Sequence, residues 1–278
     1  MAELGCSYLG IELRNPIVVA ASGLTGSVEG VKKAAAAGAG AVVLKSLFEE
    51  QLRAEISSAE SLLDSHPEAE AFFERAGMEE GARAYLDLVK GSVGQGVPVI
   101  ASVNCVGSSR WAEFAARIEE AGAQALELNM AFLPANPGET GASVEARLLE
   151  AFAEVRAATK LPLSVKLGQS YASLPNLGAE LSRLGAQGLV LFNRFYRFDV
   201  DLQALAIKAG PVRSGPEDYH ETLRWIALLS GRFPLDLAAA TGVHDGETAL
   251  KLIAAGAGAV QVCSVIYRRG FGVIGEMC

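Results

Sequence analysis

The amino-acid sequence predicts a (β/α)8 TIM barrel, and three observations support this fold class. Short apolar segments recur eight times along the chain, helical segments lie between them, and several of those helical segments end at a Gly-Ala step. The apolar segments are nearly continuous, as expected of strands in a parallel sheet that is covered on both faces. Eight strand–helix units favour a closed barrel over a doubly wound sheet. With 278 residues, 50% of them hydrophobic, we expect residues 1–278 to form a single domain.

The eight predicted strands are rich in Val, Ile, Leu and Ala. They cover residues 17–20, 41–44, 98–101, 125–128, 163–166, 188–192, 235–238 and 259–262. Helical periodicity occurs between them, at residues 111–121, 143–159, 218–229 and 247–255. Four helical segments end at a glycine followed by alanine, namely at Gly38, Gly122, Gly185 and Gly256. Glycine can take the left-handed conformation that closes a helix before the next strand.

Three segments depart from this repeat. Residues 8–14 predict a hairpin ahead of the first barrel strand. Residues 47–78 form a long polar insertion after the second strand, on the face where barrel enzymes carry their catalytic loops. This position predicts a lid or a homodimer contact, and a surface loop without a role is the alternative. Residues 267–278 leave little room for a full final helix. Either a short segment closes the barrel, or the chain ends before a helix that its relatives carry.

Composition and charge exclude several classes of function. No run of about 18 uncharged apolar residues occurs and the first residues lack a basic region before an apolar stretch, so we expect a soluble cytoplasmic protein with no membrane span. The four cysteines lack the close spacing that zinc ligation or a redox dithiol needs, so no metal site is predicted. The net charge of -8 argues against nucleic-acid binding, because phosphate backbones need a basic face.

Polar side chains follow most of the apolar segments, and in a barrel such residues converge on one face. They include Ser22, Lys45, Ser46, Asn104, Cys105, Asn129, Lys166, Asn193, Arg194, Thr241 and Ser264. The two lysines are the most informative, because a buried lysine without a partner is strongly destabilising or loses its charge. Each is therefore expected to face an anionic or electron-rich ligand. For Lys166 this is favoured over an internal ion pair to a neighbouring strand, whereas for Lys45 the two are equally supported.

Small residues follow the seventh and eighth strands, as Thr241-Gly242 and Cys263-Ser264. Their backbone N–H groups can approach an anion closely, and these two loops are the usual phosphate position in barrels. The string Ser214-Gly215-Pro216 adds a third wall. Together with Lys166, these loops predict a phosphate-bearing cofactor across the barrel mouth.

A set of short strings occurs in order along nearly the whole chain. They are Asn15-Pro16, Ala21-Ser22-Gly23, Lys45-Ser46, Glu127-Leu128-Asn129, Val165-Lys166, Asn193, Ser214-Gly215-Pro216, Thr241-Gly242-Val243 and residues 257–262. This set resembles the dihydroorotate dehydrogenase family. The resemblance implies a barrel that binds FMN and an oxidoreductase of pyrimidine metabolism, which exchanges hydride between flavin N5 and dihydroorotate or a related ring compound.

The resemblance also implies roles for individual residues. Lys166 would lie near the N1 and C2 carbonyl side of the flavin and, with Lys45, Asn129 and Asn193, would form the catalytic set. Ala21, Ser22, Lys45 and Ser46 would border the flavin, and Asn129 and Asn193 would contact the substrate and the flavin edge. Gly215, Thr241, Gly242, Cys263 and Ser264 would hold the phosphate, although Thr241 and Cys263 stand where the family usually has glycine.

The sequence departs from the family at the catalytic base. Class 1 members follow Glu-Leu-Asn with Ser-Cys-Pro-Asn and class 2 members have serine for that cysteine, but here the position is Phe132. Phenylalanine cannot remove the C5 proton that dihydroorotate oxidation requires. Cys105 and Tyr196 are weak substitutes, and Cys105 is more simply a small buried apolar residue. The chain therefore looks closest to the dihydroorotate dehydrogenase-like subgroup without the cysteine base.

Two alternatives to a flavin-dependent dehydrogenase stay open. The first is a flavin-binding protein that has lost dehydrogenase activity. The second is a phosphate-binding barrel lyase or isomerase without flavin, in which Lys166 acts as a Schiff-base or general-base amine. In each enzyme hypothesis the partner is a small anionic substrate, whose carboxylate Arg194 and Arg197 could bind; solvated arginines explain these two residues equally well.

Overall fold

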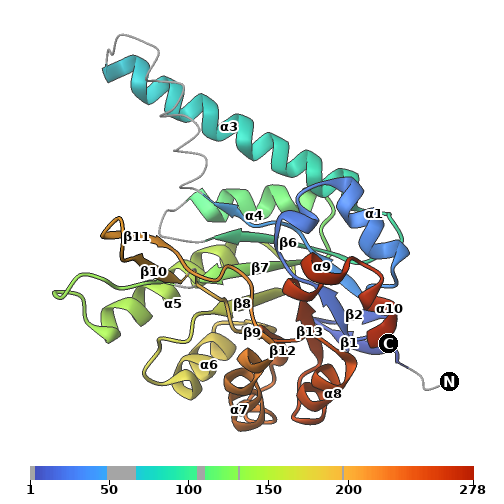
Figure 1. The fold of residues 1–278 in the computed structure, drawn as a ribbon. Coiled ribbons are helices and arrows are strands. Elements are labelled where there is room, and N and C mark those ends of the chain that lie inside the picture. The colour runs from blue at the N-terminus through green and yellow to red at the C-terminus, as the bar shows by residue number, and fades with distance from the viewer. Residues whose placement is uncertain (1–3, 49–66, 105–109, 131, 196) are drawn as a thin grey trace.

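Eight parallel strands close into a barrel in the computed structural model, which describes residues 4–48, 67–104, 110–130, 132–195 and 197–278 (Figure 1). The barrel strands are β3 (Ile17–Val19), β4 (Ala41–Val43), β6 (Val99–Asn104), β7 (Ala125–Met130), β8 (Leu163–Leu167), β9 (Gly188–Leu191), β12 (Asp236–Ala240) and β13 (Ala259–Val262). Pairing of β13 with β3 and of β4 with β6 closes the circle. The predicted fold class is confirmed. β7 continues past its predicted end, so Asn129 lies within the strand.

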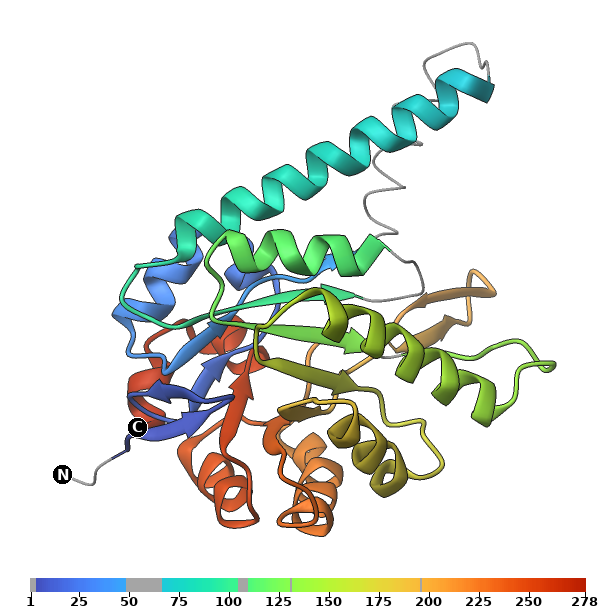
Figure 2. The same cartoon turned by 180° about the vertical axis from the view of Figure 1, so that it is seen from behind.

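Helices cover the outside of the barrel on all sides in Figures 1 and 2. They are α1 (Val28–Ala36), α3 (Pro67–Ser92), α4 (Arg110–Glu120), α5 (Gly141–Ala158), α6 (Leu174–Arg183), α7 (Tyr219–Leu229) and α8 (Gly246–Ala254). The four predicted helix-closing glycines all have positive φ, with values of 90° at Gly38, 93° at Gly122, 95° at Gly185 and 116° at Gly256. This confirms the helix, Gly-Ala, strand repeat.

The insertion predicted at residues 47–78 is partly helical. β5 (Leu47–Phe48) pairs with the end of β6, residues 49–66 lie outside the described residues, and α3 already begins at Pro67. Proline suits the first turn of a helix, and the Glu- and Ala-rich sequence that follows has high helix propensity. In both views the first part of α3 extends past the barrel (Figure 2).

The predicted N-terminal hairpin covers the end of the barrel opposite the C-terminal ends of the strands. It consists of β1 (Cys6–Tyr8) and β2 (Ile11–Leu13), paired antiparallel. Tyr8 and Leu9 are buried against barrel-interior residues such as Val18 and Ile100. Their burial closes this end, so that the C-terminal face is the one available to a ligand.

Two further features lie outside the repeat. A second antiparallel hairpin, β10 (Phe198–Asp201) and β11 (Ala206–Ala209), follows β9 and was not predicted. After β13 come two short helices, α9 (Ser264–Arg269) and α10 (Val273–Met277). Within the described residues, no helix combines the length and the apolar character needed to cross a membrane.

Candidate active site

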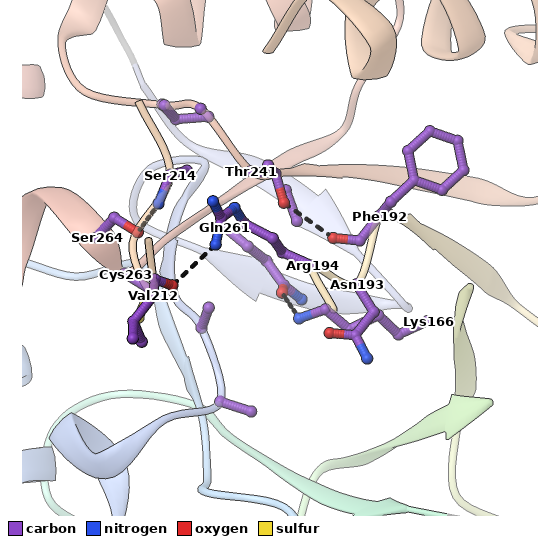
Figure 3. Close-up of a pocket in the computed structure, with 15 residues that line it drawn as sticks. Lys166, Phe192, Asn193, Arg194, Val212, Ser214, Thr241, Gln261, Cys263 and Ser264 are labelled. Carbon is purple, nitrogen blue, oxygen red and sulfur yellow. Dashed lines mark hydrogen bonds between the residues drawn. The ribbon is translucent and has the colours of Figure 1, made fainter. Parts of the chain in front are cut away.

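A pocket of about 660 Å³, counted with its open mouth, lies at the C-terminal ends of the barrel strands. It is lined by residues that end or follow β3, β8, β9, β12 and β13, which is where catalytic groups gather in this fold. Its size is typical of small-molecule and cofactor sites. Figure 3 shows Lys166 and Asn193 toward one end of the pocket and Ser214 and Ser264 toward the other.

Lys166, on β8, lines this pocket and is paired from behind. Its Nζ donates to Gln261 Oε1 at 2.8 Å and lies 3.4 Å from Glu127 Oε1, while Gln261 Nε2 donates to Glu127 Oε2 at 2.5 Å. The internal ion pair, which the sequence made the less favoured of the two interpretations of Lys166, is therefore present, and Lys166 lines the pocket as well. Strands β7, β8 and β13 all point side chains into the barrel at this level, so a carboxylate and an amide reach the ammonium while it still borders the pocket.

Gln261, within residues 257–262, is a polar residue of the site for which the sequence predicted no role. It is 2% exposed within the apolar strand β13, and it links the two charged residues. A buried amide needs hydrogen-bond partners, so a lone glutamine in the middle of an apolar strand was itself the signal.

The two asparagines of the predicted catalytic set lie together. Asn193 Nδ2 donates to Asn129 Oδ1 at 2.9 Å, although the residues are 64 positions apart. Asn129 is buried at the end of β7, and Asn193 follows β9 and lines the pocket. Asn129 also pairs in register with Lys166 on β8, so all three side chains belong to one corner of the barrel mouth. This corner presents amide and ammonium N–H donors.

The opposite end of the pocket is built from small residues and hydroxyl groups. The backbone N–H of Ser214 donates to Ser264 Oγ at 3.0 Å, which joins the segment before α7 to the start of α9. His244 lies behind, with Nε2 3.4 Å from Ser214 Oγ. Burial, followed by the charge of Arg268, lowers the pKa of His244. The predicted phosphate residues Thr241, Gly242, Cys263 and Ser264 all line this pocket.

The conformation of Thr241 shows how threonine is held at a position where the family usually has glycine. Thr241 has φ of 79°, in the left-handed region that glycine adopts most easily, and its hydroxyl donates to the Phe192 carbonyl at 3.1 Å. Gly242 follows with φ of 81°, and a Cβ there would lie 2.2 Å from the Tyr219 backbone nitrogen. The chain after β12 is thus held in a turn where one glycine is obligatory and threonine fills the other position.

Lys45 is not where the sequence placed it. The expectation of a buried lysine is wrong: Lys45 is exposed and is not among the residues that line the pocket. β4 ends at Val43, and the following chain turns so that the Lys45 N–H donates to the Thr25 carbonyl at 3.3 Å. Its side chain therefore lies on the protein surface beside η1 (Gly23–Thr25).

Four predicted cofactor contacts differ in position. Ala21 lines the pocket, whereas Ser22 accepts the Leu24 N–H at the start of η1. Ser46 is buried and bonded to Ser102 Oγ at 2.7 Å. Gly215 directly follows the pocket residue Ser214. The structure therefore places Ala21 in the pocket and Gly215 next to it, Ser22 beside the pocket residues Ala20 and Cys263, and Ser46 against Ser102.

Phe132 is the residue that the family resemblance sets at the position of the catalytic base. It is buried, with the Arg147 guanidinium 4.8 Å above its ring, and Arg147 in turn pairs with Glu139 at 2.7 Å. Nearby, the Tyr171 hydroxyl donates to the Met130 carbonyl at 2.7 Å. Burial raises the pKa of Tyr171 to about 12, so this phenol is a structural donor and a poor base. Cys105 and Tyr196, the predicted substitutes, lie outside the described residues.

Arg194 is engaged by the protein itself. Its Nη1 donates to the Pro211 and Val212 carbonyls at 3.0 and 2.9 Å, and its Nε lies 3.7 Å from Asp218 Oδ2. Burial, followed by the neighbouring Arg197, lowers the pKa of Arg194. Arg197 lies 3.5 Å from the same aspartate. Arg194 therefore joins the segment after β11 to η2 (Pro216–Asp218), and Arg197 pairs with the aspartate of the same η2.

Comparison with known proteins gives a consistent result over the whole chain. A family model described as dihydroorotate dehydrogenase matches residues 3–278. A putative dihydroorotate dehydrogenase A (fumarate) from Aeropyrum pernix is 31% identical over 175 residues, which are 60% of this chain and 55% of that protein. The catalytic subunit of dihydroorotate dehydrogenase B (NAD(+)) from Pyrococcus abyssi is 27% identical over 290 residues, 99% of this chain and 91% of that subunit.

A solved structure shows the same fold. The crystal structure of DHODH from Eimeria tenella in complex with ferulenol superposes with a TM-score of 0.68 at 15% identity, and the match covers 99% of this chain and 82% of that one. At this identity the likeness concerns the barrel architecture alone.

Proposed function

The chain belongs to the dihydroorotate dehydrogenase family, and we propose that it is an FMN-dependent oxidoreductase that exchanges hydride between flavin N5 and dihydroorotate or a related ring compound. The observation that carries this proposal is the pocket with a buried ammonium at one end and small-residue loops at the other. When bound, FMN supplies the hydride-accepting ring and a phosphate anchor. The similarity to dihydroorotate dehydrogenases makes dihydroorotate the first substrate to test.

The residues of the pocket fit FMN. Gly242, Cys263 and Ser264 lie on loops after β12 and β13, where backbone N–H groups can bind a phosphate dianion. Lys166 supplies a buried positive charge at the pocket, and its counter-ion Glu127 lies behind it. A cation in this place stabilises negative charge on a reduced flavin ring. Asn129 and Asn193 together provide amide donors beside it. In this proposal they orient the ring substrate against the cofactor.

Phe132 favours a second candidate, a flavin-binding protein with little dehydrogenase activity. The buried ring beneath Arg147 has no group that accepts a proton, and Tyr171 is a weak base bonded to a backbone carbonyl. A flavin-free lyase that uses Lys166 as a nucleophilic amine is less well supported. A nucleophilic amine must be neutral and unpaired, whereas Lys166 pairs with Glu127 and Gln261.

Two measurements in sequence test the proposal. The absorption spectrum of the purified protein, as isolated and after incubation with FMN, should show a bound-flavin band; a colourless protein that takes up no FMN would refute it. Anaerobic mixing with dihydroorotate should then bleach that band. Bound flavin that stays oxidised with dihydroorotate would favour the related ring compound or the binding role.

Location and assembly are part of the same hypothesis. We infer a cytoplasmic protein that acts on a small anionic substrate as a homodimer. Light scattering on the eluting peak of a sizing column tests the homodimer, because monomer and dimer differ twofold in mass.

A further inference from the structure

Three polar side chains form a closed network inside the barrel, directly behind the pocket. Glu127 on β7, Lys166 on β8 and Gln261 on β13 are 1%, 8% and 2% exposed. Gln261 uses both ends of its amide, because its oxygen accepts from Lys166 and its nitrogen donates to Glu127. Only Lys166 and Gln261 of the three line the pocket, so Glu127 has no direct access to a ligand there.

The pair between Glu127 and Lys166 is incomplete. Their closest atoms are 3.4 Å apart, whereas charge-assisted N–H···O bonds are usually 2.7–2.9 Å long. Glu127 Oε1 has no hydrogen-bond partner among the described residues, although it is fully buried. An orphaned buried oxygen of this kind needs an explanation. Here the negative charge of Glu127 is offset by the Lys166 ammonium, although the two groups do not form a full hydrogen bond. At least one Lys166 N–H is therefore left for the pocket.

The charge of Glu127 is felt by other groups in the barrel interior. Burial, followed by the charge of Glu127, raises the pKa of Tyr8, whose side chain lies in the hairpin that plugs the barrel. A carboxylate that acts on a phenol in this way also acts on negative charge that develops beside Lys166, which is the nearest cation to it.

We propose that Glu127 is a positioning residue that sets the reduction potential of the flavin, by partly neutralising the ammonium of Lys166 through the incomplete pair and the Gln261 bridge. This inference rests on the proposed FMN function. Reduction adds negative charge to the ring, Lys166 favours that charge, and Glu127 opposes it. Removing the Glu127 charge therefore favours the reduced form and raises the midpoint potential.

The experiment is a redox titration of the FMN-loaded protein against a reference dye at fixed pH. Neighbouring charges commonly shift an ionisation equilibrium by at least about tenfold. For Glu127→Gln we therefore expect at least about a tenfold shift toward reduced flavin, which is about 30 mV for a two-electron couple. Glu127→Met removes the same charge with a different shape and should shift the potential in the same direction, which preserves the test if one variant does not fold.

Two matched variants separate charge from structure. Glu127→Asp keeps the charge and should restore a potential near that of the parent. Ser164→Ala alters the buried residue that pairs in register with Glu127, without changing any charge, and should leave the potential unchanged. If Glu127→Gln and Glu127→Met bind FMN with the parent's potential, or if Ser164→Ala shifts it equally, the inference is wrong. A parent protein that takes up no FMN would instead refute the proposed function, and this inference with it.

Discussion

Replacing Lys166 with methionine should destabilise the protein far more than removing its partner. In Lys166→Met, the Glu127 carboxylate stays buried without a counter-ion, and its 1% exposure prevents it from reaching water. At 3.4 Å and an effective dielectric constant of about 20, the lost attraction is about 5 kcal/mol. Breaking a buried pair from one side typically costs about 3–5 kcal/mol. We therefore expect the free energy of unfolding to fall by about 3–5 kcal/mol.

The reverse change should cost less because the two partners are buried differently. In Glu127→Gln the unpaired group is Lys166, which borders the pocket and keeps its bond to Gln261. We expect a loss of about 1–2 kcal/mol, close to that of a hydrogen bond to a charged group. The double variant, Lys166→Met with Glu127→Gln, removes both charges. Its loss in free energy of unfolding should therefore be smaller than the sum of the two single losses by at least about 2 kcal/mol.

Urea unfolding followed by fluorescence, without added FMN, measures all four proteins of this cycle. The absence of added FMN matters because a ligand that binds the native state would stabilise each variant by a different amount. A Lys166→Met protein within about 1 kcal/mol of the parent, or a double variant whose loss equals the sum of the single losses, would show that the two charges do not interact energetically.

Three other predictions follow from single contacts. Gly242→Ala should lower the free energy of unfolding by at least about 2 kcal/mol, because its Cβ would meet the Tyr219 backbone and φ is 81°. The hydrogen bond from the Thr159 hydroxyl lowers the pKa of Glu119 below its ordinary 4.5. This carboxylate therefore adds stability above pH 4.5, and the added stability is lost as the pH falls through the lowered pKa. Glu119→Gln should lower the free energy of unfolding by about 1 kcal/mol at pH 7 and by almost nothing in acid. Phe132→Cys should speed flavin reduction by dihydroorotate by about 100-fold or more, in anaerobic stopped-flow.

Matched controls accompany these predictions. Gly272→Ala introduces a Cβ with no atom within 4 Å at a φ of -55°, so urea unfolding should find it as stable as the parent. For Glu119 the measurement is stability against pH, and equal slopes for parent and Glu119→Gln between pH 5 and about 3 would contradict the expectation. Phe132→Ala removes the ring without adding a base, so it should leave the rate of flavin reduction near that of the parent.

The sequence predicted the barrel because each strand is an apolar run bounded by a glycine-closed helix. Such signals are local, and they predict that polar residues after the strands meet on one face; in the structure Asn193 bonds to Asn129, which is in register with Lys166. The pairing of Lys166 was not predictable in the same way. Its partners lie 39 and 95 positions away: Glu127 is on the neighbouring strand β7, whereas Gln261 is on β13, which reaches Lys166 only because the barrel closes.

Two other misses have different causes. Lys45 reads as a buried strand-end residue, but it lies past the end of β4 at Val43 and is exposed, with its backbone N–H bonded to the Thr25 carbonyl. The hairpin β10–β11 escaped prediction because its strands lack the apolar continuity of the barrel strands. Lys208 and Asp199 lie among its exposed residues, as expected of strands that are not covered on two faces.

Different parts of the structure hold the pocket and Phe132 in place. For this reason Phe132→Cys can test the missing base separately from FMN binding. The pocket residues are fixed by barrel strands and the turns at Thr241 and Gly242, whereas Phe132 lies in the loop after β7 and packs under Arg147. A change at Phe132 should therefore leave FMN affinity unaltered. If Phe132→Cys binds FMN as the parent does and dihydroorotate now reduces it quickly, then a base was the missing part and dihydroorotate fits the site. If FMN binds but reduction stays slow in both proteins, dihydroorotate is not the substrate, and a ring compound whose reaction needs no protein base becomes the stronger candidate.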